Sequence, residues 1–228
     1  MKAVILAAGE GTRMRPLTLS TPKPLLKVGG KPIIDYILES LPTEIDEVII
    51  AVKYLGDQIK SHIGAKNLDK KIRYVTGSSL GTAYSFLATK KFLRSERFIL
   101  VHGDELTDKI DIKNCLSKEL SILVFKPDKP QACGIAYLRR DGTIKKIIEK
   151  PKKTKSTLAV DGVMVINTDI FDCTPKLAKD EFYLSTMVDL FAKSHKVFPI
   201  KAKKSIFGIS EPQDLVRAGS ILKSRQPN

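Results

Sequence analysis

Short apolar runs alternate with amphipathic segments along the first half of the chain, and this alternation limits the fold more than any other feature. Strand-like apolar runs cover residues 3–8, 48–52, 72–75 and 98–102. The segments between them predict helices over residues 32–41, 57–63 and 80–93. Strands that alternate with helices form a mostly parallel sheet with helices on both faces. We therefore expect an α/β fold, a Rossmann-like three-layer αβα sandwich around a mixed, mostly parallel sheet.

The second half of the chain is richer in strands. Its strand-like runs cover residues 121–125, 134–139, 143–149, 158–166 and 197–200. Helices are predicted over the two segments 181–193 and 211–223. No Gly/Ser-rich or Pro-rich linker separates the halves, and 228 residues suit a single domain at ~150 residues per domain. We expect this half to extend the same sheet, so that residues 1–228 form one domain.

Cysteine usage and hydropathy exclude several classes of protein. The chain has an odd number of widely spaced cysteines: Cys115, Cys133 and Cys173. This pattern is neither a disulfide framework nor a zinc motif, and it is typical of free thiols in a reducing cytoplasm. No apolar run approaches the ~18 residues that a membrane span needs. The histidines are equally scattered, and we interpret them as structural or surface residues: His62, His102 and His195.

The charge balance indicates anionic partners. Lys and Arg number 39 against 25 Asp and Glu, which gives a net charge of +14. Such an excess favours phosphorylated small molecules, nucleic acid or an acidic membrane face. The sequence has no nucleic-acid-binding motif with interleaved aromatic residues. Charge alone does not choose between these partners; the motifs described next indicate phosphorylated small molecules, with neither nucleic acid nor membrane as a partner.

The loop after the first predicted strand carries the strongest chemical signal. Residues 6–18 read LAAGEGTRMRPLT. In an open α/β sheet, ligands bind beyond the carboxyl ends of the strands. Gly9 and Gly11 allow the backbone to approach an anion closely, and Arg13 and Arg15 add positive charge suited to phosphate oxygens. The third glycine of a dinucleotide fingerprint is missing, and no Walker A loop occurs.

A second loop, TPKPLL at residues 21–26, places Lys23 between two prolines. Because proline fixes its own backbone φ, this loop is stiff. A lysine held in a stiff loop can meet a phosphate as a point charge. The alternative interpretation of Lys23 is a solvated lysine in a proline turn.

Taken together, GEGTRMRPLT and PKPLL resemble the sugar-1-phosphate nucleotidyltransferases, or NDP-sugar pyrophosphorylases. This family includes glucose-1-phosphate thymidylyl- and uridylyltransferases and mannose-1-phosphate guanylyltransferases. Further matching segments extend the resemblance over most of the chain: SLGTA at 79–83, HGDE at 102–105 and EKP at 149–151. The resemblance implies a nucleotide-binding half over residues 1–110 and a sugar-phosphate-binding half over residues 111–228.

The resemblance also implies roles for individual residues. It assigns catalysis to Arg13, Lys23 and Lys150. It assigns nucleotide binding to Leu6, Ala8, Gly9, Gly11, Thr12 and Gly81. It assigns sugar-phosphate binding to Gly134, Glu149, Lys150 and Gly162. The residue types of the EKP motif suit this task, because a carboxylate accepts hydrogen bonds from sugar hydroxyls and an ammonium neutralises a phosphate.

Metal binding is the point at which the sequence departs from the family. Asp104 ends a predicted strand, where a carboxylate facing phosphates suits Mg²⁺, and the family match assigns it as the metal ligand. The family's second metal carboxylate falls on Gly208. Glu211 could replace it only in a shifted geometry. Either Asp104 holds Mg²⁺ with phosphates and water alone, or activity is reduced or lost.

The expected reaction joins a sugar 1-phosphate to a nucleoside triphosphate and releases pyrophosphate. The segment around Gly81 and the EKP motif favour glucose 1-phosphate with UTP or dTTP. The alternatives are mannose or heptose 1-phosphate with GTP, an alcohol phosphate with CTP, and a paralogue that binds sugar nucleotides without turnover. No hexapeptide repeat follows, so we expect no C-terminal β-helix domain. Formation of a homo-oligomer is left open.

Overall fold

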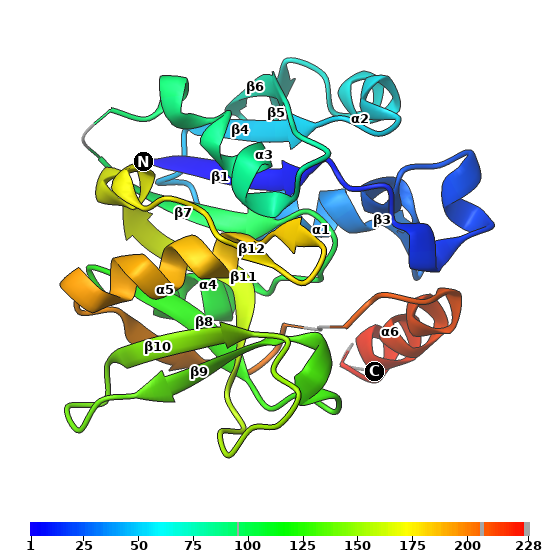
Figure 1. The fold of residues 1–228 in the computed structure, drawn as a ribbon. Coiled ribbons are helices and arrows are strands. Elements are labelled where there is room, and N and C mark those ends of the chain that lie inside the picture. The colour runs from blue at the N-terminus through cyan, green and yellow to red at the C-terminus, as the bar shows by residue number, and fades with distance from the viewer. Residues whose placement is uncertain (95, 206–207, 226–228) are drawn as a thin grey trace.

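The computed structural model describes residues 1–94, 96–205 and 208–225. The strands of its main sheet are β1 (Lys2–Ala7), β4 (Glu47–Val52), β5 (Lys66–Asn67), β6 (Lys70–Thr76), β7 (Arg97–His102), β8 (Ser121–Phe125), β9 (Gly134–Leu138), β10 (Ile144–Glu149), β11 (Ala159–Asn167) and β14 (Phe198–Lys201). Among the described residues, eight of these ten strands follow the order β10-β9-β11-β7-β1-β4-β6-β5 (Figure 1). β8 lies off this path and pairs with both β11 and β14. β1, β4, β6 and β7 are parallel, whereas β11 runs antiparallel to β7. The predicted mixed sheet with a parallel core is confirmed.

The α-helices are α1 (Ile33–Ser40), α2 (Gly56–Ile63), α3 (Thr82–Leu87), α4 (Lys109–Leu116), α5 (Leu184–Ser194) and α6 (Pro212–Ser224). Short 3-10 helices are η1 (Thr12–Met14), η2 (Leu17–Leu19), η3 (Lys23–Leu25), η4 (Lys90–Phe92), η5 (Pro130–Ala132) and η6 (Thr168–Asp172). Two small hairpins pair β2 (Lys27–Val28) with β3 (Lys31–Pro32) and β12 (Leu177–Ala178) with β13 (Glu181–Phe182). Among the described helices, none combines the length and the apolar character that crossing a membrane requires.

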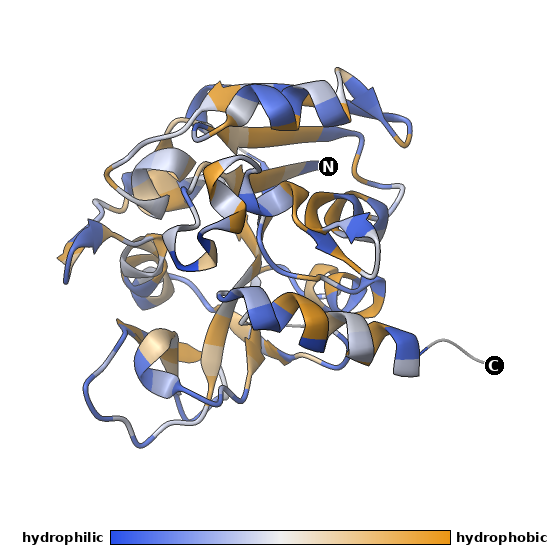
Figure 2. Ribbon diagram, turned by 90° about the vertical axis from the view of Figure 1, so that its right-hand side faces the viewer, coloured by the Kyte–Doolittle hydropathy of each residue, from blue (hydrophilic) through white to orange (hydrophobic). Residues whose placement is uncertain are grey.

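Apolar side chains fill a core on each face of the sheet. In β1, Ala3, Ile5 and Ala7 enter one core, whereas Val4 and Leu6 enter the other. The first core also receives side chains from α1, α2, α4 and α6, and the second receives those of α3 and α5. Accordingly, the helices mix hydrophilic and hydrophobic residues while the central strands are largely hydrophobic (Figure 2). The predicted three-layer sandwich is confirmed.

The structure shortens two of the predicted helices and adds one helix that was not predicted. The helix predicted over 80–93 is limited to α3 and is followed by η4, because the Thr89 hydroxyl and amide both turn back to the Phe86 carbonyl. The helix predicted over 181–193 begins only at α5, since residues 181–182 form β13. α4 was not predicted, and its first turn is capped by Asp108, which accepts from the Ile110 amide at 2.8 Å.

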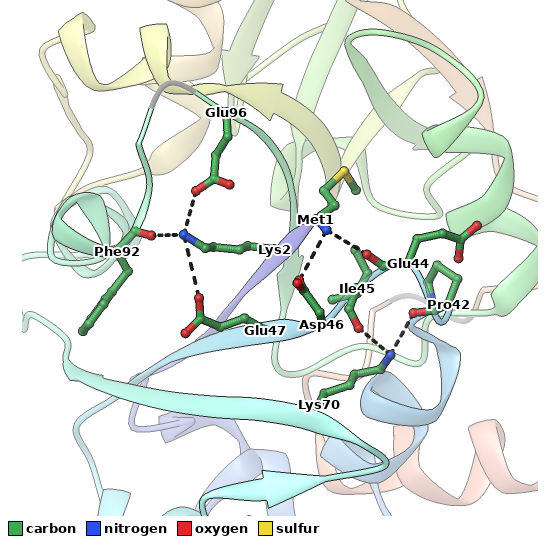
Figure 3. A network of polar contacts seen from close by, with 10 residues as sticks. All are labelled: Met1, Lys2, Pro42, Glu44, Ile45, Asp46, Glu47, Lys70, Phe92 and Glu96. Carbon is green, nitrogen blue, oxygen red and sulfur yellow. Dashed lines mark hydrogen bonds and ion pairs between the residues drawn. The ribbon is translucent and has the colours of Figure 1, made fainter.

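Charged side chains at the amino ends of the parallel strands bind one another. The Nζ atom of Lys2 lies 2.9 Å from Oε1 of Glu96 and 3.7 Å from Oε2 of Glu47 (Figure 3). Lys70 is buried and donates to two backbone carbonyl oxygens, each at 2.8 Å. This edge of the sheet is therefore stabilised by contacts within the chain. The residues singled out by the sequence lie mainly at or beyond the opposite, carboxyl ends of the strands.

Candidate functional site

A cleft of about 660 Å³ opens beyond the carboxyl ends of β7, β8 and β10, beside the amino end of α5 and along the length of α6. It brings together predicted residues from both halves of the chain: Arg13, Lys23, Asp104, Gly134, Glu149, Lys150 and Gly162. The other predicted contacts lie outside its lining, in β1, in the following loop or directly before α3: Leu6, Ala8, Gly9, Gly11, Thr12 and Gly81. The Leu6 side chain belongs to the core, and its carbonyl accepts from the Gly103 amide at 2.8 Å.

The loop after β1 is folded onto the loop that carries Lys23. Gly11 has a left-handed φ of +62°, and a Cβ at this position would lie 3.1 Å from the Thr18 side chain and 3.2 Å from that of Lys23. The Thr18 hydroxyl donates to the Gly11 carbonyl at 2.9 Å. This packing sets Arg13 at the cleft, where its exposed guanidinium forms no ion pair or hydrogen bond with a described residue. Arg13 is therefore available to an anionic ligand.

Lys23 and Asp104 meet in the cleft. Lys23 is buried in η3, and its Nζ lies 2.6 Å from Oδ2 of Asp104, just beyond β7. Burial alone would raise the pKa of Asp104, but the charges of Lys23 and His102 lower it below its ordinary value. Asp104 is thus an anion that balances a lysine. The sequence predicted a phosphate contact for one partner and a metal contact for the other, and the structure joins the two to each other.

His102 lies between the two halves of the site. It ends β7 opposite Leu6 of β1, and it lines the cleft. A Cβ at Gly162 would lie only 2.0 Å from the His102 ring, so the imidazole fills the space that the missing side chain leaves. Sequence reasoning expected a sugar to use that space, and it treated His102 as structural or surface. The role of Gly162 in sugar binding stays a prediction.

Glu149 ends β10, and its carboxylate is held by a hydrogen bond from α5. Its Oε2 accepts from the Ser185 hydroxyl at 2.7 Å, and a Cβ at Gly134 would lie 3.0 Å from the same oxygen. Gly134 therefore makes room for the carboxylate. Ser185 was missed by sequence analysis because residues 181–193 read as one continuous helix, whereas it lies in the first turn of α5.

Tyr183 was missed for the same reason, and it holds Lys150. The Lys150 ammonium donates to the Tyr183 hydroxyl and lies 4.0 Å from the centroid of its ring. The hydroxyl in turn donates to Oδ1 of Asp180 at 3.2 Å. Burial, assisted by nearby acids, raises the pKa of Tyr183, so the phenol stays protonated near neutral pH. The pKa of Glu181 is also raised by burial, against the opposing charge of Lys150.

Gly208, which stands where the family has its second metal carboxylate, lies in the cleft wall near α6. Gly208 lines the cleft with a left-handed φ of +72°, and a Cβ there would lie 3.8 Å from Nη2 of Arg217. Glu211 caps α6 by accepting from the third residue of the helix, and Asp214 reciprocates by accepting from the Glu211 amide at 2.9 Å. Glu211 thus has a structural task at the helix end. Within the described residues, no three His, Cys, Asp or Glu side chains are grouped so that they could hold a metal ion.

Comparison with known proteins identifies the family. The sequence matches the nucleotidyl transferase family over residues 2–199. The chain belongs to this family. The match includes the loop after β1, the Lys23 loop, β7 with Asp104, and the EKP motif. It ends before Gly208, so the departure lies outside the matched residues.

Several relatives of this nucleotidyl transferase have known names. The bifunctional protein GlmU of Methanococcus aeolicus is 32% identical over 231 residues, which cover 98% of this chain and 55% of that protein. The mannose-1-phosphate guanylyltransferase catalytic subunit beta of Drosophila melanogaster is 34% identical over 183 residues, covering 75% of this chain and 49% of that protein. The chain spans about half the length of these curated relatives. A UDP-glucose pyrophosphorylase complexed with UDP-glucose shares the fold, with a TM-score of 0.84 at 19% identity and 99% coverage of both chains.

Proposed function

We propose that this nucleotidyl transferase joins a sugar 1-phosphate to a nucleoside triphosphate and releases an NDP-sugar and pyrophosphate. The observation that carries the proposal is the convergence of Arg13 and Lys23 from one half with Glu149 and Lys150 from the other, around Asp104. Two phosphate-bearing substrates repel each other. A cleft with cations contributed by both halves can bring them together and stabilise the charge of the transition state.

The reaction would be an in-line displacement at phosphorus. An oxygen of the sugar phosphate bonds to the α-phosphorus, and the bond from that phosphorus to the oxygen bridging the β-phosphate breaks. The bonding electron pair leaves with pyrophosphate. Because a phosphate monoester is already ionised near neutral pH, the chain needs no general base to activate it. The cleft's contribution is then to hold two anions in line.

Each cation has a task in this scheme. Arg13, which has no partner among the described residues, would bind the triphosphate and the departing pyrophosphate. Lys23 would contact the α-phosphate from the buried 3-10 helix η3. Lys150 would orient the attacking phosphate, while Glu149 would accept hydrogen bonds from sugar hydroxyls.

Asp104 is the residue that would hold a Mg²⁺ ion. Mg²⁺ prefers oxygen ligands and is often bound by one or two carboxylates together with substrate phosphates, so a single carboxylate in a phosphate site fits it. Neither Gly208, which has no side chain, nor Glu211, which caps α6, adds a second acid. When bound, the ion would neutralise charge on the phosphates.

For the substrates, we propose glucose 1-phosphate with UTP or dTTP as the first pair to test. The support is the resemblance of the segments around Gly81 and Glu149 to enzymes that use these substrates. Mannose 1-phosphate with GTP is the second candidate, and its support is the 34% identity to the Drosophila melanogaster guanylyltransferase subunit.

Pyrophosphate release tests the proposal. The purified chain is incubated with Mg²⁺ and a grid of nucleoside triphosphates and sugar 1-phosphates, with Asp104→Ala as the control. We expect turnover in at least one combination and its loss in the control. Silence across the grid, while a nucleotide still raises the melting temperature, would favour the non-catalytic sugar-nucleotide-binding paralogue instead.

A further inference from the structure

The ammonium group of Lys150 is held by a neutral phenol although acids lie nearby. It donates to the Tyr183 hydroxyl, and it forms no ion pair with a carboxylate of the described residues. Glu181 lies close enough for the Lys150 charge to lower its pKa, although burial keeps that pKa raised. Lys23 differs, because its ammonium is paired directly with Asp104 at 2.6 Å. Lys150 thus has no ion-pair partner in the described part of the chain, although acidic side chains lie nearby.

We propose that Tyr183 is a positioning residue for Lys150, holding its ammonium toward the cleft and away from Glu181 and Asp180 so that its full charge reaches the sugar phosphate. This inference rests on the proposed function. A lysine paired with a carboxylate presents little net charge to an incoming phosphate. A phenol, by contrast, fixes the ammonium through its oxygen and its ring without neutralising it.

Hydrogen bonds to the main chain fix the backbone positions of both Lys150 and Tyr183. Lys150 has a left-handed φ of +43° directly after β10, and its amide donates to the Cys133 carbonyl at 3.0 Å. Tyr183 precedes α5, and its carbonyl accepts from the Thr186 hydroxyl at 2.7 Å. Non-glycine residues with strained φ tend to occur where the surroundings determine their position, often at functional sites. The contact between the two side chains is therefore set by two fixed points of the fold.

The Tyr183 hydroxyl is also fixed in its direction. It accepts from Lys150 and donates to Asp180, so both of its hydrogen-bonding roles are defined. Asp180 is thereby engaged by the phenol instead of by the ammonium. Without the phenol, the long and flexible lysine side chain would be free to turn to either acid. The main consequence of losing Tyr183 should therefore appear in binding of the sugar phosphate.

Two variants of Tyr183 separate the parts of the contact. Tyr183→Phe removes the hydroxyl and keeps the ring, and Tyr183→Leu removes both. We expect the KM for the sugar 1-phosphate to rise about threefold in the first variant and at least tenfold in the second, with the KM for the nucleoside triphosphate within twofold of the unaltered value. Tyr74→Phe is the matched control, because its hydroxyl donates to the Gly64 carbonyl, outside the cleft. Circular dichroism confirms that each variant is folded.

A second substitution distinguishes positioning from general structural damage. Adding Glu181→Gln to Tyr183→Leu removes a competing carboxylate, so we expect it to restore at least a third of the lost affinity for the sugar phosphate. Equal rises in both KM values, no change in a folded Tyr183→Leu, or no recovery in the double variant would overturn the proposal while leaving the reaction established. Absence of turnover by the unaltered chain with every substrate pair would overturn the proposed function and this inference with it. Should Tyr183→Leu not fold, an unchanged sugar-phosphate KM in Tyr183→Phe would overturn the proposal.

Discussion

Lys23 and Asp104 each have a proposed ligand and are also bound to each other. Their contact of 2.6 Å neutralises the carboxylate that would hold a metal and the ammonium that would meet the α-phosphate. A cation alone must compete with Lys23 for Asp104. A nucleoside triphosphate offers phosphate oxygens both to the lysine and to the cation. The pair would therefore link metal binding to nucleotide binding under the proposed function.

This linkage predicts how a divalent ion binds. We expect Mn²⁺, a spectroscopic substitute for Mg²⁺, to bind weakly to the protein alone and at least tenfold more tightly when a nucleoside triphosphate is present. Lys23→Met should strengthen binding of Mn²⁺ alone, because Asp104 loses its counter-ion, and should lower turnover about 100-fold through loss of a fixed charge. Electron paramagnetic resonance of unbound Mn²⁺ and pyrophosphate release measure the two effects. Weaker binding of Mn²⁺ to Lys23→Met would contradict the linkage.

The charge of Asp111 contributes to the stability of the fold. Its carboxylate is fully buried in α4 and accepts from the amides of Lys203, Lys204 and Ser205 at 2.8, 2.9 and 2.7 Å. Burial alone would raise the pKa of Asp111, but these backbone hydrogen bonds lower it below the ordinary value. The contacts fix the segment that follows β14, where Ser205 lines the cleft.

We expect Asp111→Asn to lower the free energy of unfolding at pH 7 by about 3 kcal/mol, since buried amide donors lose a charged acceptor. The folded-state pKa is lower than the ~3.9 of an unfolded aspartate. The stabilisation is therefore complete above that value and is lost as the pH falls through the folded-state pKa. Urea unfolding should show a difference between the two proteins that is smaller at pH 3 than at pH 7. Asp57→Asn, which changes an exposed side chain, should behave like the unaltered chain. A pH-independent difference would refute this assignment.

At the scale of elements, the sequence predicted correctly those strands whose burial produces a continuous apolar run. β1, β4 and β7 are almost entirely buried, so each reads as an uninterrupted apolar run. α4 left little such signal, because only three of its residues are buried and the first of them is the charged Asp111. The loops at the strand ends carry the residues recognised in the sequence. Tyr183 could not be found in this way, since its role depends on a contact with a residue 33 positions away.

The junction of α3 with β13 gives a prediction at this scale. A Cβ at Gly81 would lie 2.6 Å from the Phe182 carbonyl oxygen, and its φ of +123° disfavours any side chain. Gly81→Ala should therefore displace β13, lower the free energy of unfolding by about 3 kcal/mol and raise the KM for the sugar phosphate, because β13 leads directly to Tyr183. Thermal unfolding and steady-state kinetics measure these effects.

Gly9→Ala is the stability control for this experiment, because a Cβ there meets no atom within 4 Å. An unchanged stability of Gly81→Ala would refute the packing argument. A rise confined to the KM for the nucleoside triphosphate would instead support the base contact that the family resemblance implies for Gly81.

At the scale of the whole molecule, the basic side chains at the two ends of the parallel strands differ in their partners. At the amino ends, lysines are paired with acids and carbonyl oxygens of the chain itself (Figure 3). At the carboxyl ends, Arg13 has no partner among the described residues, and Lys150 is held by a neutral group. With a net charge of +14, the molecule also attracts anions over longer distances. The amino ends thus satisfy their lysines within the chain, whereas the carboxyl ends keep Arg13 and Lys150 without an ion-pair partner among the described residues.

The same sheet predicts how the molecule unfolds. β7 pairs with β1 of the proposed nucleotide half and with β11 of the proposed sugar-phosphate half, and α6 contributes Ala218 to the same core as α1. Neither half can lose its structure without exposing the core of the other. We expect calorimetry to show a single transition with an enthalpy of about 160 kcal/mol near 60 °C and a van't Hoff enthalpy equal to it. Two resolved transitions would mean that residues 1–110 and 111–228 are separate folding units. The cleft would then lie at a domain boundary instead of on one continuous sheet.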